Sequence, residues 1–153
     1  MMTNIIAVEK AERCPILVGK LLEIWEASVR SSHRFLTEAD IRTLAPQARE
    51  AIMQIETLWI VMDGPMPAGF MGVQECKIEM LFLHPGYFRK GIGRMLVQKA
   101  FSEQDVQYVD VNEQNPSAVQ FYWRMGFRTF RRDATDDLGN PFPILRMKRD
   151  GMA

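Results

Sequence analysis

The chain has few of the residues that build disulfide frameworks and metal clusters. Its 153 residues include two cysteines, Cys14 and Cys76, and two histidines, His33 and His84. Two such cysteines make no disulfide framework, which favours a reducing, cytoplasmic setting. Neither histidine lies in a Cys/His cluster with metal-ligand spacing, so we expect no metal site.

Long apolar runs and an excess of one charge are absent as well. No stretch reaches the roughly 18 apolar residues of a membrane span, and Met1 to Lys10 has neither the basic nor the apolar region of a signal peptide. Lysine plus arginine (19) balance aspartate plus glutamate (19), which gives no sign of a nucleic-acid partner. We therefore expect one soluble domain over residues 1–153, with no membrane partner.

The first half of the chain predicts a strand and then helices. Asn4 to Val8 is a short apolar run, read as a strand although a helical start would also fit. Pro15 suits the first turn of a helix, and residues spaced by three and four mark one side of it: Leu17, Leu21, Ile24, Trp25 and Ser28. Thr37 and Asp40 have the spacing of a capping box. We expect Pro46 to divide the segment after this box into a helix to about Leu44 and another from Pro46 to about Ile55.

The second half alternates strands and helices. We predict strands over Thr57 to Asp63, Ala68 to Gln74 and Cys76 to Leu83, with a turn at Gly64 to Pro67 whose prolines would interrupt pairing. The later elements are a helix from Ile92 to about Ser102, a strand Gln107 to Val111, a helix Pro116 to Met125, a strand Phe127 to Arg132, a turn over Asp136 to Pro141 and a strand around Ile144 to Lys148. This order predicts an α/β fold, a mixed sheet with helices on both faces.

The junction between Leu83 and the Ile92 helix has the features of an anion site. Arg89 and Lys90 lie in a short loop, and Gly91 and Gly93 open the helix, whose first N–H groups have no internal partner. Such a turn suits a phosphate or pyrophosphate, although a turn without a ligand would look the same. It is not a P-loop, because Ile92 and Gly93 occupy the Lys and Ser/Thr positions, and Leu96 replaces the third glycine of a dinucleotide fingerprint. A nucleotide-binding protein is therefore a remote alternative.

The same run resembles motif A of the GNAT superfamily of N-acetyltransferases, Arg/Gln-x-x-Gly-x-Gly/Ala after a strand. Phe88 departs from it at the Arg/Gln position, and Arg89 stands where many members have glycine. The resemblance implies a GNAT-like, mostly antiparallel sheet of about six to seven strands. It also implies that acetyl-coenzyme A, the cosubstrate, contacts Phe82, Leu83, Phe88, Arg89, Lys90, Gly91, Ile92, Gly93 and Arg94. In the family the strand ending near Leu83 splays from the strand near Val111 and exposes backbone groups to the pantetheine arm.

A second motif lies downstream at the usual distance. Asn115 can cap a helix, Pro116 fits its first position and Gly126 fits the residue past its end. Val109 to Phe127 resembles motif B of the same family, Val-x-Val-x-x-x-Asn-x-x-Ala-x-x-Phe-Tyr-x-x-x-Gly-Phe, at every named position. Trp25 to Leu36, with the turn beginning Asp136-Asp137, looks like the bacterial YjaB-type branch of the family.

Motif B also implies roles for individual residues. Tyr122 would protonate the departing coenzyme thiolate, and Asn115 would bind the pantetheine arm; a packed tyrosine and a simple helix cap are the alternatives. Glu79 is a candidate base, on the opposite side of a regular strand from Ile78, Met80 and Phe82, although a solvated strand glutamate fits equally well. His33 is a second candidate base, or an ordinary partly buried histidine.

These residues predict an acetyl-coenzyme A-dependent N-acetyltransferase in which an amine attacks the thioester directly. No cysteine has a recognisable nucleophile setting, which disfavours a covalent relay. The alternative is a catalytically inactive acyl-coenzyme A-binding sensor or interaction module. The amino-acid sequence is compatible with a small-molecule amine or a peptide or protein amine as acceptor, and with a monomer or a homodimer.

Overall fold

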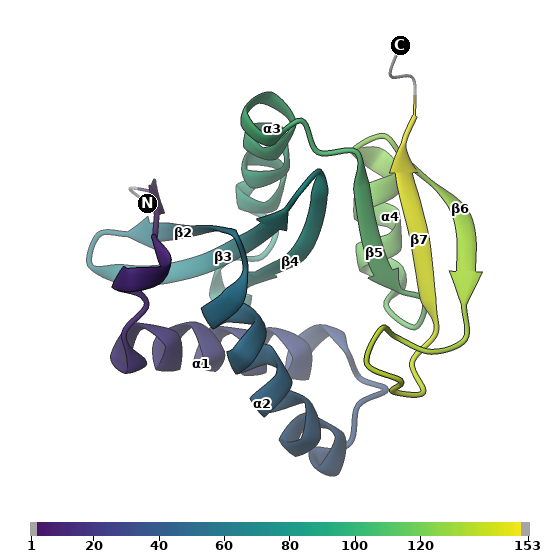
Figure 1. The fold of residues 1–153 in the computed structure, drawn as a ribbon, viewed down its shortest axis with the longest axis horizontal. Coiled ribbons are helices and arrows are strands. Elements are labelled where there is room, and N and C mark those ends of the chain that lie inside the picture. The colour runs from purple at the N-terminus through teal and green to yellow at the C-terminus, as the bar shows by residue number, and fades with distance from the viewer. Residues whose placement is uncertain (1–2, 151–153) are drawn as a thin grey trace.

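The computed structural model describes residues 3 to 150, which form one seven-stranded sheet in the order β1-β2-β3-β4-β5-β7-β6 (Figure 1). The strands are β1 (Thr3–Ala7), β2 (Thr57–Asp63), β3 (Met66–Gln74), β4 (Lys77–Leu83), β5 (Tyr108–Asn112), β6 (Phe127–Asp133) and β7 (Ile144–Arg149). Every neighbouring pair is antiparallel except β4 and β5. The predicted mixed, mostly antiparallel sheet is confirmed.

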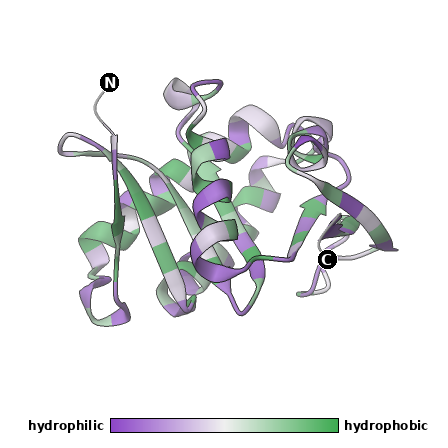
Figure 2. Cartoon of the chain, turned by 90° about the horizontal axis from the view of Figure 1, so that it is seen from above, coloured by the Kyte–Doolittle hydropathy of each residue, from purple (hydrophilic) through white to green (hydrophobic). Residues whose placement is uncertain are grey.

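Two helices cover each face of the sheet. They are α1 (Pro15–Ser32), α2 (Glu38–Gln54), α3 (Ile92–Gln104) and α4 (Pro116–Arg124), joined by two short 3-10 turns, η1 (Lys10–Glu12) and η2 (Pro85–Tyr87). Side chains of β2 alternate between the faces: Leu58 and Ile60 pack with α1 and α2, and Trp59 and Val61 pack with α3 and α4. The central strands are mostly hydrophobic along their length (Figure 2). Within the described residues, no helix is both long enough and apolar enough to cross a lipid bilayer.

Strands β4 and β5 separate after only two residue pairs. Lys77 pairs with Tyr108 and Ile78 with Val109, after which the strands diverge (Figure 1). On its other edge β4 stays paired with β3, but the register shifts so that Gly72 faces Met80 while Val73 faces Ile78. Glu79 is therefore the extra residue of a β-bulge, which bends the strand where the separation begins. Gly72 allows this close packing, since a Cβ there would lie 2.6 Å from the Cγ of Met80.

Pro46 does not divide the second helix, so that prediction is wrong. α2 runs unbroken from Glu38 to Gln54 with Pro46 inside it, and Thr37 and Asp40 form the predicted capping box. The proline removes one backbone hydrogen bond. The helix continues because both of its halves pack on the same surface, with Ile41 before the proline and Ile52 after it buried against α1 and the sheet.

The predicted turn at Gly64 to Pro67 is also shorter than expected. Only Gly64 and Pro65 form the turn, and β3 begins at Met66, with Pro67 paired to Met62. The register of this pair shifts between Val61 and Met62. A proline is tolerated in a strand beside such a bulge, where the ladder of hydrogen bonds is already interrupted.

Replacing Pro46 by Ala is expected to stabilise the protein by about 1–2 kcal/mol, because alanine restores the missing helical hydrogen bond and removes the steric clash of the ring. Pro46 is exposed, so little packing is lost. Urea unfolding measures the change in the free energy of unfolding. Pro15→Ala is the matched control: Pro15 occupies the first turn of α1, where no hydrogen bond is lost, and should bring no such gain. A Pro46→Ala protein no more stable than Pro15→Ala would contradict this account.

Candidate functional site

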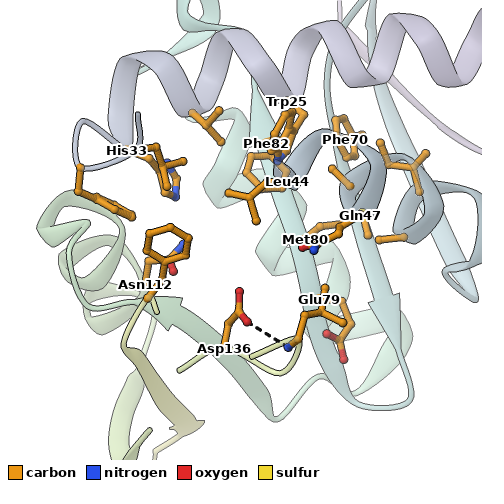
Figure 3. Close-up of a pocket in the computed structure, with 18 residues that line it drawn as sticks. Trp25, His33, Leu44, Gln47, Phe70, Glu79, Met80, Phe82, Asn112 and Asp136 are labelled. Carbon is orange, nitrogen blue, oxygen red and sulfur yellow. Dashed lines mark hydrogen bonds between the residues drawn. The ribbon is translucent and has the colours of Figure 1, made fainter. Parts of the chain in front are cut away.

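A pocket of about 280 Å³ lies on the α1 and α2 face of the sheet, beside the point where β4 and β5 diverge (Figure 3). Most of its wall is apolar or aromatic, including Trp25, Leu44, Phe70, Met80, Phe82 and Phe142. Its polar lining comes from His33, Gln47, Glu79, Asn112 and Asp136. None of the 18 described residues that line it is lysine or arginine. Two carboxylates over an apolar wall suit a cation with an aliphatic stem.

Glu79 brings its carboxylate into this pocket from the β4 bulge. Its side chain is 37% exposed, and its Oε1 lies 3.8 Å from the Nζ of Lys77. Partial burial raises the pKa of Glu79 above its ordinary value, and the Lys77 charge opposes that shift. A raised pKa makes a carboxylate a better proton acceptor.

The predicted alternation of side chains between the two sides of β4 is partly wrong. Ile78 packs with α3 and α4, as a residue opposite Glu79 should, but Met80 and Phe82 pack on the α1 and α2 face and line the same pocket as Glu79. The bulge causes this change, because one extra residue reverses the alternation of side chains beyond it.

The first turn of α3 presents free backbone amides on the opposite face. Gly91, the N-cap, has φ +81°, and Arg89 also adopts a left-handed conformation, with φ +62°. Among the described residues, no loop or turn hydrogen bond is donated by the amides of residues 91 to 94, whereas the amide of Phe88 donates to the Pro85 carbonyl at 3.1 Å. Gly91 has open space where a side chain would be, and Arg89 and Lys90 are exposed. These amides and cations fit a pyrophosphate.

The gap between β4 and β5 extends from these amides toward the pocket. Phe82 and Leu83 lie in the part of β4 that has no partner on its β5 side. Their side chains are otherwise engaged, since Phe82 packs on Phe70 and Leu83 packs against the α3 and α4 side. Any contact these two residues make in the gap would therefore come from backbone groups.

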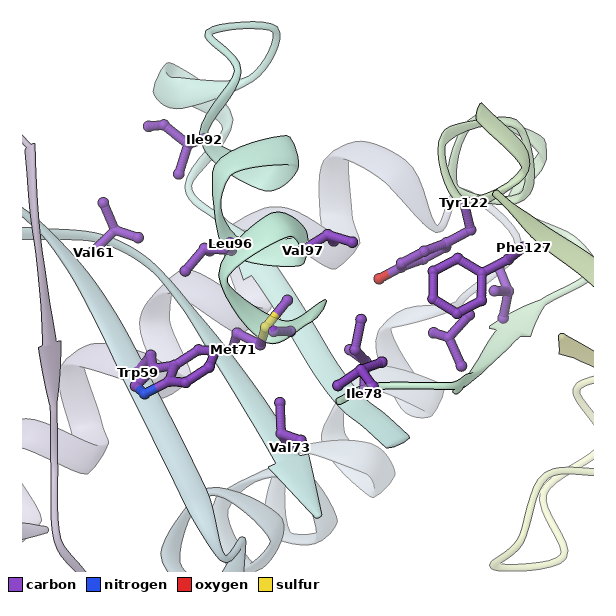
Figure 4. Packing of buried hydrophobic residues seen from close by; sticks show 14 of the residues in the cluster. Trp59, Val61, Met71, Val73, Ile78, Ile92, Leu96, Val97, Tyr122 and Phe127 are labelled. Carbon is purple, nitrogen blue, oxygen red and sulfur yellow. The ribbon is translucent and has the colours of Figure 1, made fainter. Parts of the chain in front are cut away.

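Tyr122 reaches from α4 across this gap toward α3, with its hydroxyl on the side of Val97 (Figure 4). The residue is 8% exposed, and its ring packs edge-on against Phe121 and Phe127, with centroids 5.0 and 5.7 Å away. Burial raises the pKa of the Tyr122 phenol well above its ordinary value, so it is protonated at neutral pH. A neutral phenol in this place can donate a proton or a hydrogen bond.

Asn115 lies at the N-terminus of the same helix. Its Oδ1 accepts a hydrogen bond from the Ala118 amide at 3.3 Å, which is the predicted helix cap. Asn115 is buried, as Tyr122 is, and Ala118 packs on the same cluster. All three therefore lie on the covered side of α4.

His33 lines the pocket from the end of α1. Its ring lies 5.5 Å from that of Phe35, and its Nδ1 is 2.8 Å from the Oγ of Ser32. Burial lowers the pKa of His33 to about 4, so the ring is neutral at pH 7 and adds no positive charge to the pocket.

Arg146 does not line the pocket and no sequence motif marks it, but it binds the segment that carries the lining residue Asp136. It is 9% exposed on β7, and its guanidinium binds Asp110, Asp133 and Asp137, which come from three different segments. Burial works against its charged form, but the hydrogen bonds to these carboxylates raise the pKa of Arg146 overall. The sequence signal for Arg146 is the alternation of side chains along β7. Leu145 and Met147 pack on the α3 and α4 face, so Arg146 between them points to the other face. Its partners depend on the register of three strands, which no motif encodes.

Comparisons with known proteins agree on one family. A model described as an acetyltransferase (GNAT) domain matches residues 32–148. The chain is 38% identical to the peptidyl-lysine N-acetyltransferase YjaB of Salmonella typhimurium over 129 residues, 84% of this chain and 88% of that protein. It is 36% identical to YjaB of Escherichia coli, over 84% of this chain and 87% of that one.

Solved structures extend the likeness to the whole fold. The solution structure of apo-form YjaB from Escherichia coli matches with a TM-score of 0.85 and 32% identity, covering 99% of this chain and 100% of that one. A PaiA N-acetyltransferase from Thermoplasma acidophilum, crystallised in complex with coenzyme A, matches with a TM-score of 0.69 and 18% identity, over 97% of this chain and 99% of that one. The second match is a likeness of fold alone.

The buried His33 predicts a loss of stability in mild acid. The ordinary histidine pKa of about 6.5 applies to the unfolded chain, while the folded value is about 4. Between these values the unfolded state binds more protons, so the free energy of unfolding should fall by about 2 kcal/mol from pH 7 to pH 5 because of this one group. Urea unfolding at both pH values should show that His33→Gln lacks this loss and that His84→Gln, which keeps His33, retains it. An equal loss in the wild type and His33→Gln would contradict the prediction.

Proposed function

The chain belongs to the GNAT family of acetyltransferases, and from that premise we propose that it transfers the acetyl group of acetyl-coenzyme A to lysine side chains of polypeptides. The observation that carries this proposal is the meeting of two sites at Glu79. Free backbone amides and the β4–β5 gap lie on one face of the sheet, and the pocket on the other face is lined by residues of both diverging strands, among them Glu79, Met80 and Asn112.

The coenzyme side is assigned from the free backbone groups. The amides of residues 89 to 94 hold the pyrophosphate, assisted by the charges of Arg89 and Lys90. The unpaired backbone of Phe82 and Leu83 and the side-chain amide of Asn115 receive the pantetheine arm. Phe88 belongs to the coenzyme side as part of the loop that carries these amides, since its own backbone amide already donates to the Pro85 carbonyl. The bound cosubstrate supplies an acyl group activated as a thioester.

The acceptor side is assigned to the pocket. Lysine fits it because the carboxylates of Glu79 and Asp136 attract an ammonium group while apolar residues such as Leu44 and Met80 cover the aliphatic stem. The names of the YjaB relatives support a peptidyl lysine as acceptor. A more distant relative, the peptidyl-lysine N-acetyltransferase YiaC of Escherichia coli, is 27% identical over 70% of this chain.

The chemistry requires two proton transfers. At pH 7 a lysine with a pKa of about 10.4 is neutral in only about one molecule in 2,500, a deficit of roughly 4.6 kcal/mol. Glu79 accepts the ammonium proton, directly or through a water, and the freed amine attacks the thioester carbon. As the new C–N bond forms and the C–S bond breaks, the Tyr122 phenol donates its proton to the sulfur. A covalent relay needs an activated nucleophile, and neither cysteine lines the pocket.

Replacing Tyr122 by Phe is expected to lower kcat by about 100-fold or more, because a general acid contributes at least that much. The assay combines thiol release from acetyl-coenzyme A with mass spectrometry of a lysine-containing peptide. Tyr108→Phe, on β5 with its ring against Phe130, is the matched control and should keep wild-type kcat. Calorimetry should give the same acetyl-coenzyme A affinity for both variants. Full turnover by Tyr122→Phe at all pH values would defeat the acid role, and a wild-type protein without acceptor-dependent release would defeat the function.

The raised pKa of Glu79 predicts the acid limb of the pH profile. The base must be ionised, so kcat/KM should fall as pH drops through a pKa above the ordinary glutamate value of about 4.3. Glu79→Gln should abolish this limb and reduce kcat/KM at pH 8 by about 100-fold. Glu75→Gln, in the exposed turn before β4, is the control and should keep the limb. Persistence of the limb in Glu79→Gln would assign the base to another group.

A further inference from the structure

We propose that Arg146 is a positioning residue that sets the acceptor specificity of the pocket, because it fixes the segment between β6 and β7 against the sheet. This segment, residues 134–143, is called the β6–β7 loop below. The proposal rests on the assignment of the pocket to the acceptor.

The Arg146 guanidinium ties three parts of the chain together. Its Nη1 lies 2.6 Å from Oδ2 of Asp110 on β5, its Nε 2.7 Å from Oδ2 of Asp133 at the end of β6, and its Nη2 2.8 Å from Oδ1 of Asp137 in the β6–β7 loop. The Arg146 side chain is 10% exposed, so water competes little on its side of these contacts. Because a guanidinium is a planar, rigid fork, two of its arms fix the direction of the third.

The β6–β7 loop behaves as a unit because Asp136 binds it internally. Oδ1 of Asp136 accepts the amides of Leu138 at 3.0 Å and Asn140 at 2.8 Å, and Oδ2 accepts the side-chain amide of Asn140 at 2.8 Å. Asn140 also donates to Oε1 of Gln47 on α2 at 3.2 Å. A displacement of Asp137 therefore carries the neighbouring residues with it.

This unit forms one wall of the pocket. Asp136, Leu138 and Phe142 line it, and the ring of Phe142 packs 5.6 Å from that of Phe35, another lining residue. Figure 3 shows the Asp136 carboxylate pointing into the pocket, on the same side of it as Glu79. The position of the loop thus decides whether the second carboxylate faces an entering ammonium group.

The charges around Arg146 make its role specific. It neutralises three carboxylates, while Lys77 binds Asp110 and approaches Glu79, and Arg131 binds Asp133. Asp137 has no second ion-pair partner among the described residues. Loss of the Arg146 contact would leave Asp137 with only the more distant Lys77 charge to offset repulsion from Asp133, and the loop would lose its ion pair to the sheet. The coenzyme contacts on the other face would be unaffected.

Two variants and a matched control test this inference. Asp137→Asn removes only the loop's ion pair, and Arg146→Lys keeps the charge but loses the fork. Arg132→Lys is the control, because Arg132 on the same hairpin binds the single carboxylate of Glu113, away from the pocket. The readouts are KM and kcat for a lysine-containing peptide, the affinity for acetyl-coenzyme A, and hydrogen exchange of the Leu138 and Asn140 amides.

We expect Asp137→Asn to raise the acceptor KM about fivefold, and Arg146→Lys to raise it about tenfold or more. In both, kcat at saturating peptide and the affinity for acetyl-coenzyme A should stay near wild type, and the two loop amides should exchange faster. Arg132→Lys should change none of these.

An unchanged KM in Asp137→Asn, or a loss confined to kcat or to coenzyme affinity, would overturn the inference. Should Arg146→Lys fail to fold, Asp137→Asn alone decides the question. Failure of the proposed function can be told apart from failure of this inference, because in that case the wild-type protein itself would acetylate no lysine peptide. Faster amide exchange in Asp137→Asn would then still show that Arg146 holds the loop, while the specificity role would fall with the function.

Discussion

The two residue pairs that join β4 to β5 are the constraint on which the rest of the site depends. Parallel strands normally continue their ladder, but here the bulge at Glu79 bends β4 and ends the pairing after Ile78. This irregularity has two effects: it begins a gap lined by backbone groups, and it turns Met80 and Phe82 to the face on which Glu79 lies. Both substrates of a two-substrate reaction can then approach one point from opposite faces of the sheet.

The site separates its charges by face. The free amides at the start of α3 and the exposed Arg89 and Lys90 make one side attractive to phosphate groups. The pocket on the other side has carboxylates, a neutral His33 and no cationic side chain among its described lining residues. Lys77 on β4 and Arg146 on β7 are both engaged with the carboxylate of Asp110. Such a division lets an anionic cosubstrate and a cationic acceptor be held near each other without competing for the same groups.

Much of the fold could be predicted because local chemistry decides it. The spacing of the apolar residues predicts α1, and the capping box of Thr37 and Asp40 predicts the start of α2. The two motifs predict α3, which begins after Gly91, and α4, which carries Tyr122. The errors came where tertiary packing overrides a local rule: Pro46 continues a helix held at both ends, and Met80 changes face after a bulge. The contacts of Arg146 with Asp110, Asp133 and Asp137 could not be predicted, since they join residues up to 36 positions apart through sheet register.

The strand order has a consequence for how the protein forms. β7 is the last strand along the chain, yet it lies between β5 and β6 and pairs with both. During synthesis on the ribosome, β6 therefore has no neighbour until residues 144–149 have emerged, and β5 is left with only its two pairs to β4. The N-terminal half, β1 to β4 with α1 and α2, can assemble earlier from nearer contacts. The segment that carries Arg146 is thus the last to join the sheet, so a nascent chain can fix the pocket wall formed by the β6–β7 loop only after that strand has paired.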